Sequence, residues 1–221
     1  MAPAISLLEV TSAALIGSGV VAGVFAWSTI SALARRGAPF VPTSQRKIDH
    51  IICGTKGLLR VLPPAQRASM HVVDLGSGSG SLVRAAVRRG GFGRGSGFEL
   101  NPGLVAWSRL GSFLSSTESF HLADLWTADI ADADIIFVYG VPSILGALER
   151  KLVSELRDGA FVVSNNFPFA ADGQSEAPRL VLLDKQHIDV SRFELDDSSN
   201  VFLYEVVRGA TRASGTARRE R

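Results

Sequence analysis

The strongest chemical signal in the sequence is a glycine-rich loop that directly follows a short apolar segment. Residues 71–75, with the sequence HVVDL, lead straight into Gly76-Ser77-Gly78-Ser79-Gly80. Glycines let a backbone turn tightly and approach a ligand without a Cβ in the way. A dinucleotide-binding loop has the spacing G-x-G-x-x-G, but Ser81 stands where its third glycine would fall. A Walker loop ends in Gly-Lys-Ser/Thr, and this loop does not. The loop therefore predicts a ligand that is not held through a pyrophosphate.

Three acidic residues indicate what that ligand is. Asp74, Glu99 and Asp124 each stand at the end of one of three successive predicted strands. Carboxylates at these positions attract a cation and repel a pyrophosphate. The spacing acidic-x-Gly-x-Gly-x-Gly resembles the loop with which class I methyltransferases bind S-adenosylmethionine, whose sulfonium and ammonium groups are cationic. We expect Asp74 beside that cationic part and Glu99 on the ribose hydroxyls.

The adenine of the same cofactor is expected next to the third strand. Asp124 is placed to accept a hydrogen bond from the adenine amino group, with Leu125 and Trp126 beside the ring. The full set of predicted cofactor contacts is Asp74, Gly76, Ser77, Gly78, Gly80, Glu99, Leu100, Asn101, Asp124 and Leu125.

Strands and helices must alternate to bring these residues together. Apolar runs predict strands over residues 71–75, 95–100, 119–124, 134–140 and 161–166, with a closing pair at 179–184 and 201–207. Helices are predicted over residues 81–89, 102–113 and 142–156, the last two opening at a proline. A short amphipathic helix precedes them, with Ile48, Ile51 and Ile52, and later Leu58, Leu59 and Leu62, on one side. This alternation predicts an α/β fold, an open parallel sheet covered on both faces.

The N-terminus carries a different signal. Residues 10–34 contain no charged residue, and at about 1.5 Å per residue this run can cross a hydrocarbon layer of roughly 30 Å. Glu9 precedes the run and Arg35–Arg36 follow it, which favours the cytoplasm or a mitochondrial matrix for the C-terminal side. The segment is therefore interpreted as a transmembrane helix, with a buried soluble helix or a targeting sequence as the alternatives.

Composition bounds the remaining possibilities. The chain of 221 residues divides into a membrane segment (1–36), a linker and pre-domain helix (37–66), a catalytic domain (67–207) and a basic disordered tail (208–221). The net charge of +2 gives no case for nucleic-acid binding. The single cysteine, Cys53, excludes an internal disulfide and a cysteine-based zinc site, and the four histidines are too scattered for metal ligation. No metal is therefore expected.

Further segments carry a more specific resemblance. They are Pro39-Phe40-Val41-Pro42, Ile48-Asp49-His50, residues 74–78 and 97–102, Asp124-Leu125-Trp126, Tyr139-Gly140-Val141-Pro142 and Phe167-Pro168-Phe169. This succession, over residues 39 to 206, resembles the mitochondrial protein-lysine methyltransferases that modify the ATP synthase c subunit or the adenine nucleotide translocase. The Gly-Val-Pro at 140–142 looks closer to the c-subunit branch.

The resemblance implies a class I methyltransferase fold with a Rossmann-like, mostly parallel seven-stranded sheet. It implies S-adenosylmethionine as donor and, as acceptor, a lysine of a membrane protein, the ATP synthase c subunit or the adenine nucleotide translocase. The enzyme would lie in the mitochondrial inner membrane, held in the bilayer by residues 10–34, with its catalytic domain facing the matrix. The family has an aromatic residue where Gly103 stands and an arginine where Asn166 stands, and both departures are expected near the acceptor side.

Aromatic side chains are the candidates for the acceptor channel. Transfer to an amine needs a neutral lysine, which an apolar channel favours by keeping water away. Tyr139 and Phe167, with Phe169 and Trp126, are predicted to build its walls. Two alternatives share the fold: a membrane-anchored methyltransferase of a lipid-like or quinone acceptor, and a non-catalytic scaffold subunit of a membrane complex.

Overall fold

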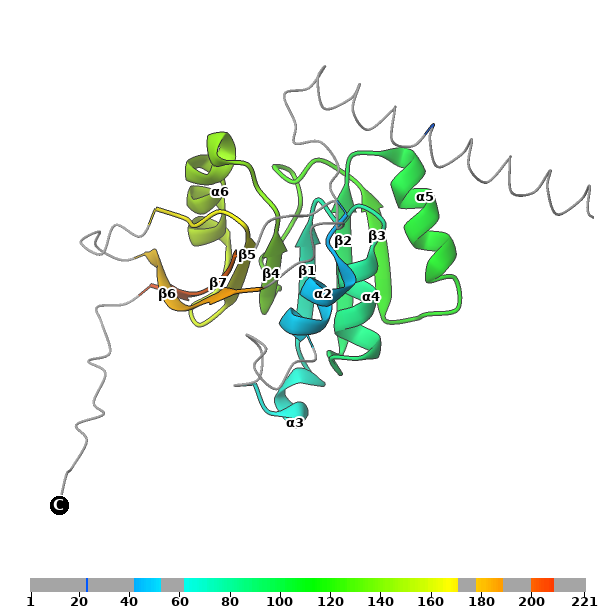
Figure 1. The fold of residues 1–221 in the computed structure, drawn as a ribbon, viewed down its shortest axis with the longest axis horizontal. Coiled ribbons are helices and arrows are strands. Elements are labelled where there is room, and N and C mark those ends of the chain that lie inside the picture. Colours follow the sequence, from blue (N-terminus) through cyan, green and yellow to red (C-terminus); the bar gives the residue numbers. More distant parts are fainter. Residues whose placement is uncertain (1–22, 24–41, 53–61, 171–177, 189–199, 209–221) are drawn as a thin grey trace, which may run out of the picture.

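A seven-stranded sheet forms the centre of the protein. The computed structural model describes residues 23, 42–52, 62–170, 178–188 and 200–208. The strands are β1 (His71–Leu75), β2 (Arg94–Glu99), β3 (Glu118–Leu122), β4 (Ile135–Val138), β5 (Phe161–Asn165), β6 (Arg179–His187) and β7 (Asn200–Val207). Their order across the sheet is β3-β2-β1-β4-β5-β7-β6 (Figure 1). Strands β1 to β5 are parallel, whereas β7 is antiparallel to both β5 and β6. The predicted mostly parallel sheet with a closing pair is confirmed.

Helices connect the parallel strands. They are α2 (Gln45–Ile52), α3 (Pro64–Arg67), α4 (Ser81–Arg88), α5 (Pro102–Gly111) and α6 (Pro142–Glu155). Both α5 and α6 begin at a proline, whose fixed φ suits the first helical turn and whose missing N–H has no intrahelical partner there. The predicted elements are present with ends shifted by one or a few residues; α5, for example, stops at Gly111 rather than near Phe113.

Alternate side chains along the central strands pack against opposite helical layers. Val72 of β1 and Ile135 of β4 face the cluster that holds the isoleucines of α2 and the alanines of α4. Their neighbours Val73 and Ile136 face the leucines of α6 on the other side. Figure 1 shows α2 and α4 in front of the sheet, with α5 beyond β3 at one end and α6 at the other. The strand ends that carry the predicted cofactor residues therefore belong to a sheet whose central strands are buried on both faces.

Parts of the predicted organisation fall outside the described residues. Except for Gly23, the segment 10–34 is not described, nor are Leu58, Leu59 and residues 209–221. Within the described ranges, no helix combines the length and the apolar character that crossing a bilayer requires.

Candidate cofactor site and acceptor cleft

The glycine loop bends back over the end of the neighbouring strand. The backbone N–H groups of Gly76 and Ser77 both donate to the carbonyl oxygen of Phe98, at 2.9 and 3.0 Å. Gly76, Gly78 and Gly80 have φ angles of 88°, 53° and 74°, a region that side chains disfavour. The loop therefore needs glycine at all three positions, and Gly80 then leads into α4.

A fourth glycine lets the loop lie directly on β2. A Cβ on Gly97 would lie 2.6 Å from Ser77 Oγ and 2.7 Å from Phe120 Cδ1. Ser77 Oγ is buried and has no hydrogen-bond partner among the described residues. An unpaired buried hydroxyl costs free energy, so a ligand that bonds to Ser77 would remove a penalty carried by the free protein.

Glu99 ties the loop to the start of α5. One oxygen of its carboxylate accepts from the N–H of Gly78 at 2.9 Å, and the other accepts from the N–H of Asn101 at 2.8 Å. A carboxylate oxygen can accept two hydrogen bonds, so each retains capacity for a further donor. Glu99 is therefore fixed in place by the backbone and still able to accept two hydroxyls, as its predicted ribose contact requires.

Asp74 lies in the wall of the site, within β1. Its side chain is 7% exposed. Burial raises the pKa of Asp74 to about 7, and the nearby negative charge of Glu99 contributes in the same direction. A cationic ligand at this point would offset both effects, since it favours the ionised carboxylate. This is the electrostatic behaviour expected of a residue that receives an ammonium or sulfonium group.

Asn101 caps a helix at the predicted cofactor site, whereas Leu100 offers an exposed apolar side chain there. The Oδ1 of Asn101 accepts from the N–H groups of Gly103 and Leu104, at 2.9 and 3.3 Å, and so caps α5. Its buried Nδ2 has no partner in the described part of the chain, which leaves a donor for a ligand. Leu100 is 37% exposed at the same strand end. Gly103 lies in the first turn of α5, on this side of the site.

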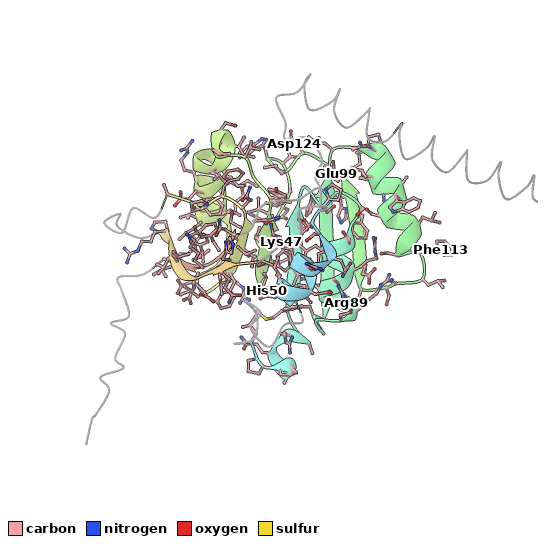
Figure 2. The ribbon with its side chains drawn as sticks, in the orientation of Figure 1. Lys47, His50, Arg89, Glu99, Phe113 and Asp124 are labelled. Atoms are coloured by element: carbon pink, nitrogen blue, oxygen red, sulfur yellow. The ribbon has the colours of Figure 1, made fainter. Side chains whose placement is uncertain are left out.

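Asp124 sits in a turn after β3. Its Oδ1 accepts from the N–H of Trp126 at 3.1 Å, and its carboxylate is partly exposed. Leu125 packs against the core beside it, whereas Trp126 is exposed. Figure 2 shows Glu99 and Asp124 at the same edge of the sheet. The predicted adenine position is thus next to the predicted ribose position, and its individual contacts stay predictions.

A cleft opens where the strand order reverses, between β1 and β4. Ligands of open α/β sheets bind at this switch point. The lining combines the loop, the segment before α2, the last turn of α2, the start of α4, and residues of β4 and β5: Pro42, Thr43, Ile51, Asp74, Gly76, Ser77, Ser79, Ser81, Leu82, Phe137, Val138, Tyr139, Val163 and Asn165. Of the predicted acceptor residues, only Tyr139 lies here.

The prediction that Phe169 lines the channel is wrong. Phe169 is 2% exposed, and its ring packs edge-on against Tyr204 with 5.4 Å between centroids. The backbone turns sharply at Asn166, whose φ is 73°, and Ser164 Oγ donates to the carbonyl of Phe167 at 2.6 Å. After this turn, Phe169 packs in the core cluster that also holds the leucines of α6. Phe167 is half-buried against the same core and does not line the cleft.

Asn165 is a cleft residue that the sequence reasoning missed, and it bonds to Lys47, which does not itself line the cleft. Lys47 has no exposed surface, and its Nζ donates to Asn165 Oδ1 at 2.7 Å. The same Nζ lies 6.0 Å from the centre of the Tyr139 ring. Helical spacing was the available signal: Lys47 stands four residues before Ile51, so it shares the apolar stripe of α2. Figure 2 shows Lys47 at the middle of the molecule, over the central strands.

Within the described ranges, no three His, Cys, Asp or Glu side chains lie together as potential metal ligands. The buried imidazole of His71 instead bonds to Ser96 and Asp132, at 2.8 and 3.2 Å. Burial lowers the pKa of His71. This histidine holds β1 to its neighbours.

Comparison with known proteins agrees with this geometry. The ANTKMT methyltransferase domain family matches residues 74–176. The lysine N-methyltransferase of the ATP synthase c subunit from Xenopus laevis is 34% identical over 160 residues, which cover 70% of this chain and 68% of the relative. The adenine nucleotide translocase lysine N-methyltransferase of Mus musculus is 38% identical over 133 residues, covering 59% of this chain and 53% of the relative.

A solved structure shows the same fold with a product of the cofactor. The crystal structure of an RNA methyltransferase from Salinibacter ruber in complex with S-adenosyl-L-homocysteine has a TM-score of 0.57 and 27% identity. The match covers 78% of this chain and 97% of that one.

Fold, cleft and comparisons together define an S-adenosylmethionine-dependent methyltransferase of class I. Within that class, the chain belongs to the lysine N-methyltransferase family that includes the enzymes named for the ATP synthase c subunit and for the adenine nucleotide translocase. The residues fit this cofactor: Glu99 retains acceptor capacity, Ser77 Oγ and Asn101 Nδ2 are buried without partners among the described residues, and Asp74 needs a cation.

Proposed function

We propose that this protein methylates a lysine of a mitochondrial membrane protein, and that the acceptor is the ATP synthase c subunit. The observation that carries the proposal is the composition of the cleft. Asp74 and the loop residues Gly76, Ser77 and Ser79 line the β1 side, whereas Tyr139 and Asn165 line the β4–β5 side. The relatives named for the c subunit, and the Gly140-Val141-Pro142 sequence after β4, support this choice of acceptor.

One side of the cleft suits the methyl donor, and the opposite side suits the acceptor. We name the group formed by Asp74, residues 76–80 and Glu99 the donor half, because its members suit a cationic nucleoside ligand; Glu99 bonds to the loop but does not itself line the cleft. We name the side formed by Tyr139 and Asn165 the acceptor half. S-adenosylmethionine, when bound, supplies an electrophilic methyl group, so the protein has only to hold a neutral amine in line with it.

The acceptor half can bind an amine, but it contains no strong base that would remove the proton of the amine. The aromatic face of Tyr139 attracts a cationic nitrogen, and the side-chain carbonyl of Asn165 accepts a hydrogen bond from it. Phe137 and Val163 complete an apolar wall that keeps water away. Exclusion of water disfavours the charged form of the amine, and the neutral form is the nucleophile.

A membrane location completes the proposal. Residues 10–34 would anchor the protein in the mitochondrial inner membrane, with the catalytic domain on the positively flanked matrix side. The described domain supports proximity to an apolar phase, since Trp107, Leu110, Phe113 and Leu114 at the end of α5 are all exposed, the last by 94%. Figure 2 shows Phe113 at the outer margin of the molecule. Exposed apolar groups of this extent mark interaction surfaces.

The activity is tested with purified c subunit in detergent and a donor that carries a deuterated methyl group. Mass spectrometry should find the label on a lysine of the c subunit, and Asp74→Ala should abolish it. Asp129→Ala, which removes an exposed carboxylate elsewhere, is the matched control and should retain activity. If the protein labels an extracted lipid fraction and no protein, the lipid alternative is correct.

The anchor is tested by deleting residues 1–36. The truncated protein should leave the membrane fraction in a carbonate wash, keep its affinity for the cofactor, and methylate the native substrate more slowly, because tethering replaces a three-dimensional search. A truncated protein that stays with the membrane and methylates at the normal rate would show that the segment is not the anchor.

A further inference from the structure

The outer face of α5 carries an exposed apolar surface. It consists of four side chains that are between 60% and 94% exposed and that we name the α5 patch: Trp107, Leu110, Phe113 and Leu114. Leu110 follows Trp107 by about one helical turn. The chain keeps turning after the helix, since the N–H of Phe113 donates to the carbonyl of Leu110 at 3.4 Å. The opposite face of α5 is buried through Leu104 and Val105. The helix is thus apolar on both faces, whereas a helix with water on one side is normally polar there.

The α5 patch lies at one end of the molecule, apart from the cleft. Strand β3 is at the edge of the sheet, and α5 lies beyond it (Figure 1). Figure 2 shows Phe113 at the outer margin of the molecule. None of the four side chains lines the cleft. A partner that covers the α5 patch therefore leaves the donor half and the acceptor half accessible.

Two arginines border the α5 patch, and the stretch that carries it exposes no carboxylate. Among residues 100–122 the only acidic residue is Glu118, whose side chain is 1% exposed and is paired with Arg88. The half-exposed Arg88 also donates to the carbonyl of Gly111 at 2.9 Å, directly beside the patch. Arg109, within α5, is exposed as well. The patch is therefore apolar with a positively charged margin.

This combination suits the interface of a bilayer that contains anionic lipids. Tryptophan, phenylalanine and leucine side chains bury themselves at the boundary between headgroups and acyl chains, and arginines beside them attract lipid phosphates. A second copy of this chain is a poorer partner for the same surface, because a contact between two such patches brings charges of one sign together.

We propose that the α5 patch inserts into the interfacial layer of an anionic bilayer and forms a membrane contact separate from residues 10–34. The inference rests on the proposed membrane location and adds the surface that orients the catalytic domain. A single anchoring segment leaves a domain free to rotate about its linker. A second contact on α5 holds the sheet with its β3 edge toward the lipid and keeps the cleft uncovered.

The experiment uses the full-length protein in vesicles made of equal parts phosphatidylcholine and phosphatidylglycerol. The single cysteine, Cys53, is replaced by serine, and an environment-sensitive fluorophore is attached to a cysteine introduced at Leu110. We expect its emission to shift to shorter wavelength on the vesicles and to be quenched by lipids that carry a nitroxide on the acyl chain. The shift should be smaller on vesicles of phosphatidylcholine alone, because the arginines then lack anionic partners.

The matched control carries the same fluorophore at Leu183. This leucine is 47% exposed, but it belongs to β6, at the opposite edge of the sheet from β3. Its emission should neither shift nor be quenched. A second readout needs no variant: lipids with a photoreactive acyl chain should label the wild-type peptide that contains Phe113 and Leu114, and not the peptide that contains Leu183.

The outcomes separate the inference from the proposed function. Vesicle-bound protein without a response at Leu110 overturns the inference and leaves the proposed membrane location intact, as do equal responses at Leu110 and Leu183. A response that appears without lipid and grows with protein concentration assigns the patch to a second copy, and one that requires the c subunit assigns it to the acceptor; either overturns the inference. Quenching at Leu110 together with no methylation of the c subunit supports the inference and overturns the proposed acceptor.

Discussion

Glu99 is held in its working position before any ligand arrives. Its two carboxylate oxygens accept from the backbone of Gly78 and of Asn101, one on each side of the site. The same side chain therefore fixes the glycine loop, fixes the start of α5 and retains acceptor capacity for the predicted ribose contact. Such preorganisation lowers the entropic cost of binding, because the groups do not have to be ordered by the ligand.

Replacement of Glu99 should weaken cofactor binding by an amount that depends on what replaces it. Glu99→Ala removes both the charge-assisted contacts to ribose and the two backbone bonds, and we expect S-adenosylmethionine to bind roughly 30- to 150-fold more weakly. Glu99→Gln keeps the shape and one acceptor oxygen, and we expect a loss of about tenfold. Isothermal titration calorimetry measures both. Unchanged affinity in the alanine variant would remove Glu99 from the site.

The raised pKa of Asp74 makes cofactor affinity depend on pH. Its pKa is about 7 in the free protein, and a cationic cofactor binds the ionised form better. The affinity for S-adenosylmethionine should therefore increase as the pH rises from about 6 to about 8 and then level off. Asp74→Asn cannot ionise, so its weaker binding should be nearly flat across this range. A wild-type affinity that falls with rising pH would contradict the assignment.

The same group has the opposite effect on the stability of the free protein. The native state holds the Asp74 proton up to about pH 7, whereas an unfolded chain releases it near pH 3.8. Its contribution to stability is thus complete below pH 3.8 and is lost as the pH rises through about 7. Asp74→Asn should have a melting temperature above that of the wild type by about 4 °C or more at about pH 8. Calorimetry at about pH 5 should find a smaller difference.

At the scale of elements, β2 positions the glycine loop from behind. Gly97 leaves room for Ser77, and Gly95, two residues earlier on the same strand, leaves room for Val83 of α4. A Cβ on either glycine would lie under 3.0 Å from a neighbour. One glycine is therefore required by the loop and the other by the helix.

The two alanine variants should separate these roles. Gly97→Ala and Gly95→Ala should each destabilise the fold by about 1–3 kcal/mol through overpacking. Only Gly97→Ala should also lower the affinity of the folded protein for S-adenosylmethionine, because only that Cβ displaces Ser77. Chemical denaturation and calorimetry at a temperature where both variants are folded measure the two effects. Equal affinities would show that the loop tolerates the displacement.

Much of the element layout could be predicted from local sequence. The buried strands read as continuous apolar runs, and prolines marked where α5 and α6 begin. The donor half was accessible for the same reason, because its residues follow strands whose ends are readable. The acceptor half was not. Lys47, which bonds to Asn165, stands among the isoleucines of α2 and has no distinguishing pattern of its own. The position of Phe169 was predicted wrongly because the backbone is left-handed at Asn166, where no glycine marks a turn in the sequence.

At the scale of the whole molecule, β7 joins the acceptor side to the far end of the sheet. It is antiparallel to both β5 and β6, and its Tyr204 is 1% exposed. The hydroxyl oxygen of Tyr204 accepts from the N–H of Phe169 at 3.0 Å. The segment that follows Asn165 is therefore fixed by a strand that comes 35 positions later in the chain.

Removal of that hydroxyl should weaken the whole fold. Tyr204→Phe leaves the Phe169 N–H without this partner, which should cost about 1–3 kcal/mol in the free energy of unfolding. Glu205→Gln, at the next and partly exposed position of β7, should cost less than about 0.5 kcal/mol. Urea denaturation compares the two. If Tyr204→Phe is as stable as Glu205→Gln, the hydrogen bond does not anchor the segment.

The contact between Lys47 and Asn165 joins residues 118 positions apart, and this separation sets an order of maturation. A growing chain that has reached residue 124 already contains β1, β2, β3 and every group of the donor half. At that stage β4, β5 and β7, against which α2 packs in the finished fold, have not yet been made. Closing so long a loop is slow compared with pairing neighbouring strands. The donor half can thus form before the elements of the acceptor half have been made. A cofactor bound at that stage would stabilise β1, β2 and β3, against which the later strands pack.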